Sequence, residues 1–470
     1  MISHVAKHEI RRYLRDGRSR ALLLAVLVML VASLTFSFRN YQLASHQYEQ
    51  NQKQLRANWE QQSQKDPHDA AHDGTYVIKP LHPLSVIDRG IQPYTGKVVH
   101  LGAHQRKQST LNEAKDHAGA FRFGELTPSF LVTYLIPLLL VLLGFSAFTE
   151  ENEKRTLRLL LVQGVTRREL ALGKWLALFM QAAVMWLVVF LATLLVNLIL
   201  DDQTMISFAE VLTLSGVYLL YFSIFVSLII WVSSKASSSG SALTILITTW
   251  IVFALVVPKV STNLAGWIYP FPTLQTFQNN INQDQESGLN GHNFWNEAAK
   301  DFEREVLSEY GVETVEELPV EFGGLLLAEG EKYESEIYTK HFDLLQNQYK
   351  KQRAVYQWSS LFSPMLPVRF ISMGISRTDY GFLWRFEDQA EEYRVEFNTA
   401  LNMDIARNAK GIEQYTAGKE LWEGISEFSY QWQQGHEVLR GHIFEIAATF
   451  FWAAISFFIA IFYCRKLDVA

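Results

Sequence analysis

The sequence contains a single cysteine, Cys464, among 470 residues. One thiol cannot form a disulfide within the chain or a cysteine-based zinc site, so neither kind of cross-link is available to the fold. We expect Cys464 to behave as a small apolar residue near a membrane surface, which is the common behaviour of a free cysteine.

The sequence also lacks an excess of basic residues. Its formal net charge is -6 and its isoelectric point is about 6.1. Domains that bind nucleic acid carry a basic patch or stripe, together with a recognisable motif, and none of the RNA- or DNA-binding motifs is found here. We therefore expect no nucleic acid among the partners.

No phosphate-binding loop of the form G-x-x-x-x-G-K-[ST] occurs in the sequence. Gly96-Lys97 and Gly173-Lys174 lack the upstream glycine and the following Ser or Thr that cradle phosphate. Neither a Ser-His-Asp nor a Cys-His arrangement can be recognised. We expect this chain to bind no nucleotide or other cofactor, and to contain no catalytic residue.

Histidine pairs with metal-ligand spacing are few. The two pairs are His68/His72 and His100/His104. Asp69 and Asp73 beside the first pair allow a metal site, but no H-E-x-x-H motif is present, and the second pair lies in a strand-like region where this spacing separates the side chains. We expect solvated histidines and no bound metal. Similarly, we expect Glu303, Glu305, Glu391 and Glu392 to form solvated helix faces.

Long apolar segments without charge are the main positive feature. They cover residues 21–38, 126–149, 175–200, 211–232, 236–257 and 446–464. Each reaches the roughly 18 residues needed to cross hydrocarbon, so the predicted fold class is an α-helical polytopic membrane protein with six transmembrane helices. We interpret the first as a retained span, not a cleaved signal peptide. In the second span, Pro137 and Gly144 favour either a bend or close helix packing.

The absence of charge inside these spans has a functional meaning. Proton-coupled transporters and ion channels usually need intramembrane Asp, Glu, Lys or His. Only scattered polar residues such as Gln181 and Asn197 are present. The sequence therefore argues against both classes.

Basic residues in the short connections predict the orientation. Residues 1–20 and 150–174 each carry six Lys or Arg, residues 465–466 add two more, and residues 201–207 carry none. Because Lys and Arg collect on the cytoplasmic side, both termini are predicted to be cytoplasmic. Residues 1–20 are predicted to form an amphipathic cytoplasmic helix, with a merely basic flank as the alternative.

The same orientation places residues 39–125 and 258–441 outside the cytoplasm as a large, mainly helical domain with some β structure. The runs TYVIKP and KVVHLG predict short strands. Residues 333–358 and 379–437 predict helices, separated by SPMLPVRF, where Pro364 and Pro367 break the helical pattern.

The charged stretch at 149–174, TEENEKRTLRLLLVQGVTRRELALGK, lies between the second and third spans. Its apolar run is too short to cross a bilayer, so we interpret 150–174 as a cytoplasmic coupling element on which a separate motor protein docks. Orientation is assigned to Glu150, Glu151, Glu153, Arg167 and Arg168, and apolar contact to Leu157, Leu160 and Leu161. The alternative is a basic loop that only fixes topology.

This stretch resembles the permease subunits of ABC transporters of the type-2 exporter class. Their pattern is Glu-x-Gly-Thr-Leu, leucines, a turn with Ser/Thr-Arg, and Gly-Lys opening the third span. The matching residues are Glu153, Thr156, Leu157, Leu160, Gly164, Val165, Thr166, Arg167, Gly173 and Lys174. Arg155 stands where the family commonly has glycine, which leaves the local backbone turn open. The run SPMLPVRFISMGISRTDYGF, with Glu392-Tyr393-Arg394, resembles a subgroup with a large extracytoplasmic domain of unknown function.

The resemblance implies a permease subunit of an ATP-driven exporter in a bacterial inner membrane. ATP and Mg would be bound by a partner ABC ATPase, and the permease would pair with a second copy or a sister permease, with envelope or periplasmic partners also implied. Two rivals remain: a membrane-anchored envelope sensor or scaffold acting through its outer domain, and an outer-facing hydrolase. Lipid, peptide, glycan and small-molecule substrates all stay open.

Overall fold

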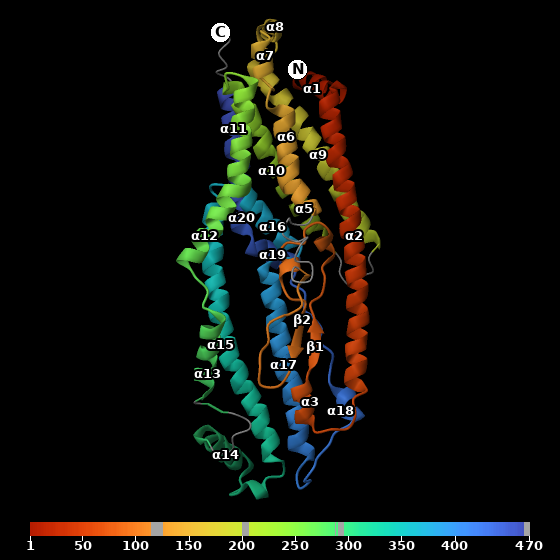
Figure 1. The fold of residues 1–470 in the computed structure, drawn as a ribbon, viewed down its shortest axis with the longest axis vertical. Coiled ribbons are helices and arrows are strands. Elements are labelled where there is room, and N and C mark those ends of the chain that lie inside the picture. Colours follow the sequence, from red (N-terminus) through yellow and green to blue (C-terminus); the bar gives the residue numbers. More distant parts are fainter. Residues whose placement is uncertain (114–125, 200–205, 287, 290–295, 465–470) are drawn as a thin grey trace.

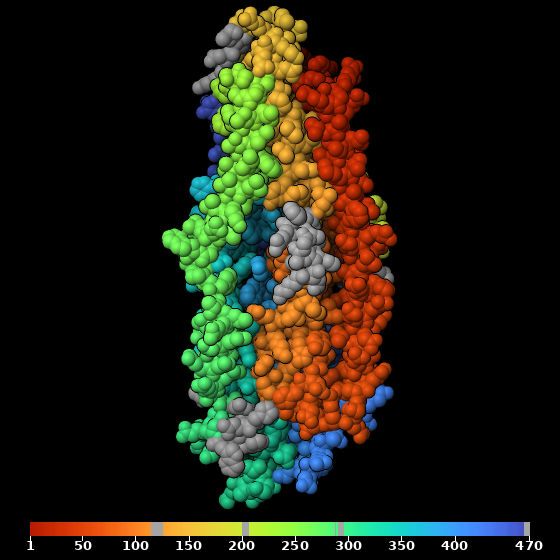
Figure 2. Space-filling model, in the orientation of Figure 1, coloured from red at the N-terminus to blue at the C-terminus, as the bar shows by residue number. Residues whose placement is uncertain are grey.

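The protein is elongated and mainly helical, with an apolar helix bundle at one end and a polar half at the other (Figures 1 and 2). The computed structural model describes residues 1–113, 126–199, 206–286, 288–289 and 296–464. Residues 201–205, from the connection without Lys or Arg, and the basic residues Arg465 and Lys466 were used for the predicted orientation and lie outside the described residues.

Six helical segments are long and apolar enough to cross a membrane. They are Gly17–Glu60, Pro128–Glu153, Arg167–Ile199, Phe208–Lys235, Ser239–Ile268 and Ile443–Cys464. They correspond to α2, the run α5–α7, α9, α10, the run α11–α12 and α20. This matches the predicted number of spans and confirms an α-helical polytopic membrane protein.

The first span is longer than the charge-free segment that revealed it. Helix α2, Gly17–Glu60, runs without interruption through the predicted span and on through the polar residues that follow it. It is preceded by α1, Ile2–Arg15, and the Asp16 side chain between them caps α2 by accepting from the Ser19 backbone N–H at 2.9 Å. Good helix formers and a lack of Gly or Pro explain why α2 continues beyond the apolar segment.

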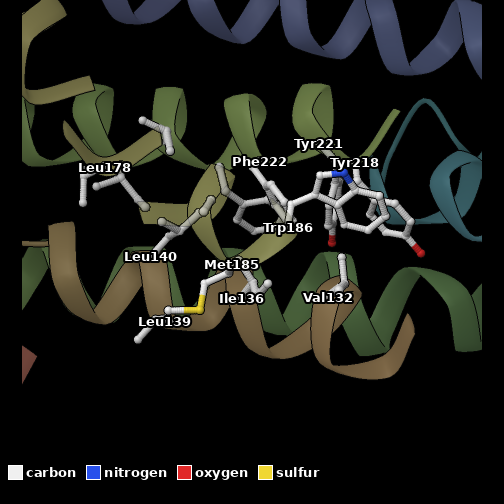
Figure 3. Close-up of a cluster of buried hydrophobic side chains, with 14 of the residues drawn as sticks. Val132, Ile136, Leu139, Leu140, Leu178, Met185, Trp186, Tyr218, Tyr221 and Phe222 are labelled. Atoms are coloured by element: carbon white, nitrogen blue, oxygen red, sulfur yellow. The ribbon is translucent and has the colours of Figure 1, made fainter. Parts of the chain in front are cut away.

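The bundle core forms where the second, third and fourth spans meet (Figure 3). Trp186 of α9, Arg167–Ile199, packs on Tyr218 of α10, Phe208–Lys235, with ring centroids 4.6 Å apart. Leucine and isoleucine side chains of α6, Ile136–Gly144, fill the remaining space beneath these rings. Helix α20, Ile443–Cys464, packs against α10 from the other side.

Two spans contain a short π-helical segment just before a proline. These are η4, Leu131–Leu135, ahead of Pro137, and η6, Val252–Val256, ahead of Pro258. A proline has no N–H, so it leaves carbonyls in the preceding turn without a helical partner. Side chains fill this role: the Tyr221 hydroxyl donates to the Thr133 carbonyl at 2.9 Å, and the Ser363 hydroxyl donates to the Phe253 carbonyl at 2.8 Å.

The polar half combines a β-hairpin with long helices. Strands β1, Thr75–Ile78, and β2, Val98–Leu101, pair antiparallel, as the two Val-rich runs predicted. The hairpin lies between α2 and α17, and α17 packs along α15 (Figure 1). The helices of this half are α3 (Pro67–Asp73), α13 (Leu274–Glu286), α14 (Glu297–Tyr310), α15 (Phe322–Ser359), α17 (Tyr380–Asn408), α18 (Lys419–Gly424) and α19 (Gly435–Gly441).

Two expectations for this half are wrong. The helix predicted over 379–437 forms only in its first half, because α17 covers Tyr380–Asn408 and Gly411 then adopts φ 75°, which turns the chain. Pro367 does not break a helix: it lies in the first turn of α16, Met365–Ile375, where a backbone N–H needs no helical partner. Pro364 does separate α15 from α16, as predicted, and forms the N-cap of α16.

Helix α16 joins the bundle to the polar half through buried polar contacts. The Tyr218 hydroxyl donates to Ser372 at 2.9 Å, and the Ser372 hydroxyl donates to Asp88 at 2.6 Å. Just beyond α16, Arg377 donates to Glu210 at 2.6 Å, and both side chains are buried. These contacts connect the fourth span to two segments of the polar half.

Candidate functional site

The predicted coupling element forms two short helices at the tip of the bundle (Figure 1). They are α7, Thr149–Glu153, and α8, Leu157–Val162. Arg155 between them adopts the left-handed conformation with φ 56°, and Gly164 after α8 has φ 86°. The position where glycine was expected therefore keeps the backbone turn that favours glycine.

The turn into α9 is fixed by a capping pair. The Glu169 backbone N–H donates to the Thr166 hydroxyl oxygen at 3.2 Å, while the Glu169 carboxylate accepts from the Thr166 N–H at 3.0 Å. This reciprocal arrangement is the capping box. It explains why Thr166 stands immediately before α9, which begins at Arg167.

The acidic residues of the element bind partners within the chain. Glu153 accepts from the backbone N–H of Ser239 at 2.7 Å, at the start of α11, Ser239–Ile251. Glu150 pairs with Lys154 at 2.6 Å, and Glu151 accepts from Lys174 at 2.7 Å. Glu151 and Glu153 thus hold the element on α9 and α11, whereas the Glu150–Lys154 pair lies within the element.

Lys174 lies at the centre of a buried ionic cluster. Its side chain is 1% exposed, and its Nζ donates to Glu9 of α1 and to Glu151 of α7, each at 2.7 Å. Arg12 also contacts Glu9, at 3.3 Å. Breaking a buried pair by removing one partner typically costs about 3–5 kcal/mol, so α1, α7 and α9 are joined firmly here.

Gly173 explains the other half of the Gly-Lys motif. A Cβ added at this position would lie 2.5 Å from the side chain of Val5 and 3.1 Å from the carbonyl oxygen of Ile2. Glycine therefore allows α1 to lie directly on α9. The close approach in turn places Glu9 within reach of Lys174.

The leucines of α8 divide between the two sides of the helix. Leu157 is 2% exposed and belongs to the hydrophobic core of the bundle, so it anchors the helix and cannot contact a partner as predicted. Leu160 and Leu161 are half-buried against the same core. The outward apolar side chains are Leu159 and Val162, which are 63% and 86% exposed.

The remaining predicted residues frame this outward surface. Thr156 is the N-cap residue of α8, and its hydroxyl donates to the Glu151 carbonyl at 3.4 Å. Arg167 is half-buried and Arg168 is exposed. Sequence reasoning missed Glu9 and Ser239, which lie far away in the chain, although a lone glutamate on the buried face of a basic helix was a detectable signal.

The second group of predicted ligands lies in the polar half, and the expectation of solvated side chains is wrong for several of them. His104 meets His68 and His72, and its side chain is 15% exposed. Burial lowers the pKa of His104, but a hydrogen bond with Glu334 and the charge of Glu331 outweigh burial and raise it. His100 points elsewhere, to the Asp73 carbonyl at 3.0 Å, as its strand position predicted.

Glu391 is not on a solvated face either. It is buried and accepts from Arg394 at 2.8 Å, and Arg394 also donates to the fully buried Glu331 at 2.6 Å. Glu392 and Glu305 are exposed and Glu303 is half-buried. Of these two neighbouring carboxylates on α17, Glu391 thus faces the interior and Glu392 faces solvent.

Six apolar helices, with a charged helical element between the second and third, define a multi-pass membrane protein of the permease type. The family model described as ABC-2 family transporter protein matches residues 3–299, so the chain belongs to this family and is the membrane permease of an ABC transporter. A domain of unknown function, DUF3526, matches residues 275–431. No curated protein matches the chain.

Proposed function

We propose that this chain moves substrate across or out of the bacterial inner membrane when a separate ABC ATPase, which binds ATP and Mg²⁺, pushes on α7 and α8. The observation that carries the proposal is the position of these helices. They project from the tip of the bundle and are joined by Glu153, Glu151 and Leu157 to three other parts of the fold. A push on them must therefore move several helices together.

The exposed side chains of α8 identify the docking surface. Leu159 and Val162, three residues apart on α8, form its apolar centre, and Arg168 and Lys154 are exposed basic residues on either side of α8 in the chain. A hydrophobic centre with a polar rim is the usual anatomy of a protein interface. We assign this surface to a groove on the ATPase, because the energy for transport has to come from a subunit that binds nucleotide.

The orientation rests on charge. Basic residues gather at the tip that carries α1, α7 and α8, which supports a cytoplasmic tip and cytoplasmic termini. The polar half, including the hairpin and α13 to α18, is then extracytoplasmic. A domain of this size suits contact with envelope or periplasmic partners.

A second permease, identical or sister, is expected beside the fifth span. Only 17% of the apolar window in Ser239–Ile268 is buried, against 33–67% in the other five spans. Exposed apolar residues along it include Ile245, Leu255 and Val256. A substrate path between two permeases would place this surface at the shared boundary.

The docking surface is tested by co-purification with the candidate ATPase. The double variant Leu159→Glu/Val162→Glu is expected to lower ATPase recovery at least tenfold, because two charges replace the apolar centre of the interface. Leu14→Glu on α1, also apolar and 52% exposed at the same tip, is the matched control and should bind normally.

Deleting residues 153–168 removes α8 and with it the whole proposed docking surface. If the ATPase is still recovered in full with the double variant and with the deletion, the docking proposal is wrong. A chain that acts in the envelope without any ATPase would instead indicate the sensor or scaffold function.

A further inference from the structure

Three histidines meet in the polar half, where the hairpin region packs on α15 and α17. One ring nitrogen from each of His68, His72 and His104 lies within 4.8 Å of the other two. The ring centroids are 4.6 Å apart for His68 and His72 and 5.2 Å apart for His72 and His104. Two of these residues are close in sequence, but the third comes from a separate turn.

The local backbone is built to bring them together. His68 and His72 lie one turn apart on α3, Pro67–Asp73, which has Asp66 as its N-cap and Gly74 as its C-cap. Gly74 has φ 64°, and a Cβ there would lie 2.2 Å from the Leu101 carbonyl oxygen. The chain can therefore bring α3 against the end of β2, where the Ala103 N–H donates to the Ala71 carbonyl at 2.9 Å.

His104 itself is held in an uncommon conformation. Its backbone has φ 63°, which a residue with a side chain rarely adopts. Its N–H donates to Glu331 at 2.7 Å, and this contact fixes the turn. Such outliers persist where surrounding contacts over-determine them, and they gather at binding sites.

The outer ring nitrogens have oxygen partners. Nδ1 of His68 lies 2.9 Å from Oδ1 of Asn402, and Nδ1 of His104 lies 2.9 Å from a carboxylate oxygen of Glu334. Each Nδ1 therefore carries the proton and donates it. The two Nε2 atoms then present lone pairs to each other at a separation of 3.4 Å. A cation between them, either a proton or a metal ion, is required to make this contact favourable.

The separation of the Nε2 atoms fits a metal ion. Zinc binds imidazole nitrogen at about 2.0–2.1 Å in a tetrahedron, which places two ligand nitrogens about 3.3–3.4 Å apart. Metal-bound histidines also donate their second ring nitrogen to a carboxylate or amide oxygen, as His104 and His68 do. We propose that His68, His72 and His104 form a binding site for Zn²⁺.

The neighbouring carboxylates Glu331 and Glu334 hold His104 in place by hydrogen bonds and are not metal ligands. Glu331 already accepts from Arg394 at 2.6 Å, and the Arg394 side chain is 1% exposed. A dication on Glu331 would lie next to this buried guanidinium, which is unfavourable. Glu334 faces Nδ1 of His104, on the side of the ring away from His68. Nitrogen ligands without oxygen also disfavour Ca²⁺ and Mg²⁺.

The fourth coordination position faces outward. His72 is exposed, whereas His68 and His104 are half-buried. Three protein ligands with an open position are typical of zinc sites that hold water or an exchangeable ligand. The site also connects two segments far apart in sequence, because α3 and the turn after β2 supply the ligands while α15 and α17 supply Glu334 and Asn402.

The test uses the full chain in detergent micelles, with any histidine tag removed and the metal stripped by a chelator. Zn²⁺ is titrated in competition with a chromophoric chelator. One equivalent should bind per chain, and His68→Ala and His104→Ala should each abolish stoichiometric binding. Glu334→Gln should weaken binding about 10–100-fold, the usual effect of removing a partner of a metal-bound histidine.

His100→Ala is the matched control, since this histidine lies on β2 outside the cluster and should leave binding unchanged. X-ray absorption of zinc-loaded wild-type protein gives a readout that does not depend on a variant folding, and should show three nitrogen ligands at about 2.0–2.1 Å. Failure to bind zinc saturably, oxygen-only ligation, or unchanged affinity in the His104→Ala variant would overturn the proposal and leave a proton shared between His68 and His104.

Discussion

Arg155 occupies a backbone conformation that is unfavourable for arginine and easy for glycine. Its φ of 56° lies in the left-handed region, which costs a residue with a side chain about 1–2 kcal/mol. The turn between α7 and α8 nevertheless forms, because α7 is fixed by Glu153 and α8 by Leu157. The contacts of Glu153 and Leu157 thus offset the unfavourable backbone conformation of Arg155.

Arg155→Gly should stabilise the turn by about 0.5–1 kcal/mol, since the left-handed strain disappears while the unfolded chain gains some freedom. Hydrogen exchange of the backbone amides at 149–165 is the measurement, and exchange should slow about twofold to fivefold. Lys154→Gly is the control, because Lys154 has an ordinary φ of -83° and should show faster exchange. Equal changes in the two variants would contradict this interpretation.

Single residues also mark the limit of sequence reasoning. The departure at Arg155 was visible in the sequence, but its φ was not. The meeting of His68 with His104, and of Glu9 with Lys174, depends on contacts between residues 36 and 165 positions apart. Periodicity within one helix carries no information about such pairs.

At the scale of elements, the contact between α1 and α9 is one that the sequence alone did not predict. Residues 1–20 are predicted to form an amphipathic cytoplasmic helix, and the structure has the helix α1 there. Its buried face packs on α9, with Ala6, Glu9 and Tyr13 turned inward. Gly173 is the residue of α9 that permits this packing.

Gly173→Ala should displace α1, because the added Cβ would lie 2.5 Å from Val5. Limited trypsin digestion in micelles should then cleave at Arg11, Arg12 or Arg15 at least about threefold faster, as expected when about 1 kcal/mol of packing is lost. The same change at Gly216 in α10 is the control, since a Cβ there meets nothing within 4 Å. Identical digestion of the two variants would rule out the proposed role of Gly173.

Element prediction succeeded where the signal was local. Charge-free runs located the six spans, because the hydrophobic requirement of a bilayer is set along one helix. The β-branched and aromatic runs TYVI and VVHL, bounded by turn residues, located both strands of the hairpin. The helix predicted to continue to 437 ends at Asn408, and Gly411, Gly418 and Gly424 in the following chain favour an irregular path.

The whole molecule consists of two halves joined by the continuous helix α2 and by buried contacts around α16. The Arg377–Glu210 pair is one of them, linking the segment after α16 to the start of the fourth span. Both side chains are almost fully buried, 5% and 2% exposed. If transport requires the halves to move together, this pair belongs to the connection between them.

Arg377→Met should destabilise the protein by about 3–5 kcal/mol, because it leaves the Glu210 carboxylate buried without its partner. Adding Glu210→Gln should recover part of the loss. The melting temperature of the full chain in micelles is the measurement. Arg304→Met removes an exposed pair with Asp301 and should change stability by less than about 1 kcal/mol. A similar small effect at both arginines would show that the buried pair does not hold the halves together.

Helix α2 gives the molecule a lever arm. Its 44 residues span about 66 Å at 1.5 Å per residue, from Asp16 beside the coupling tip to the polar half. At the far end, Trp59 is buried, and its ring nitrogen donates to the Trp422 carbonyl at 3.0 Å. A tilt of α2 by about 5° around Asp16 would move its Trp59 end by about 6 Å. A small rotation at the coupling tip would therefore become a displacement of several residues' packing at the opposite end.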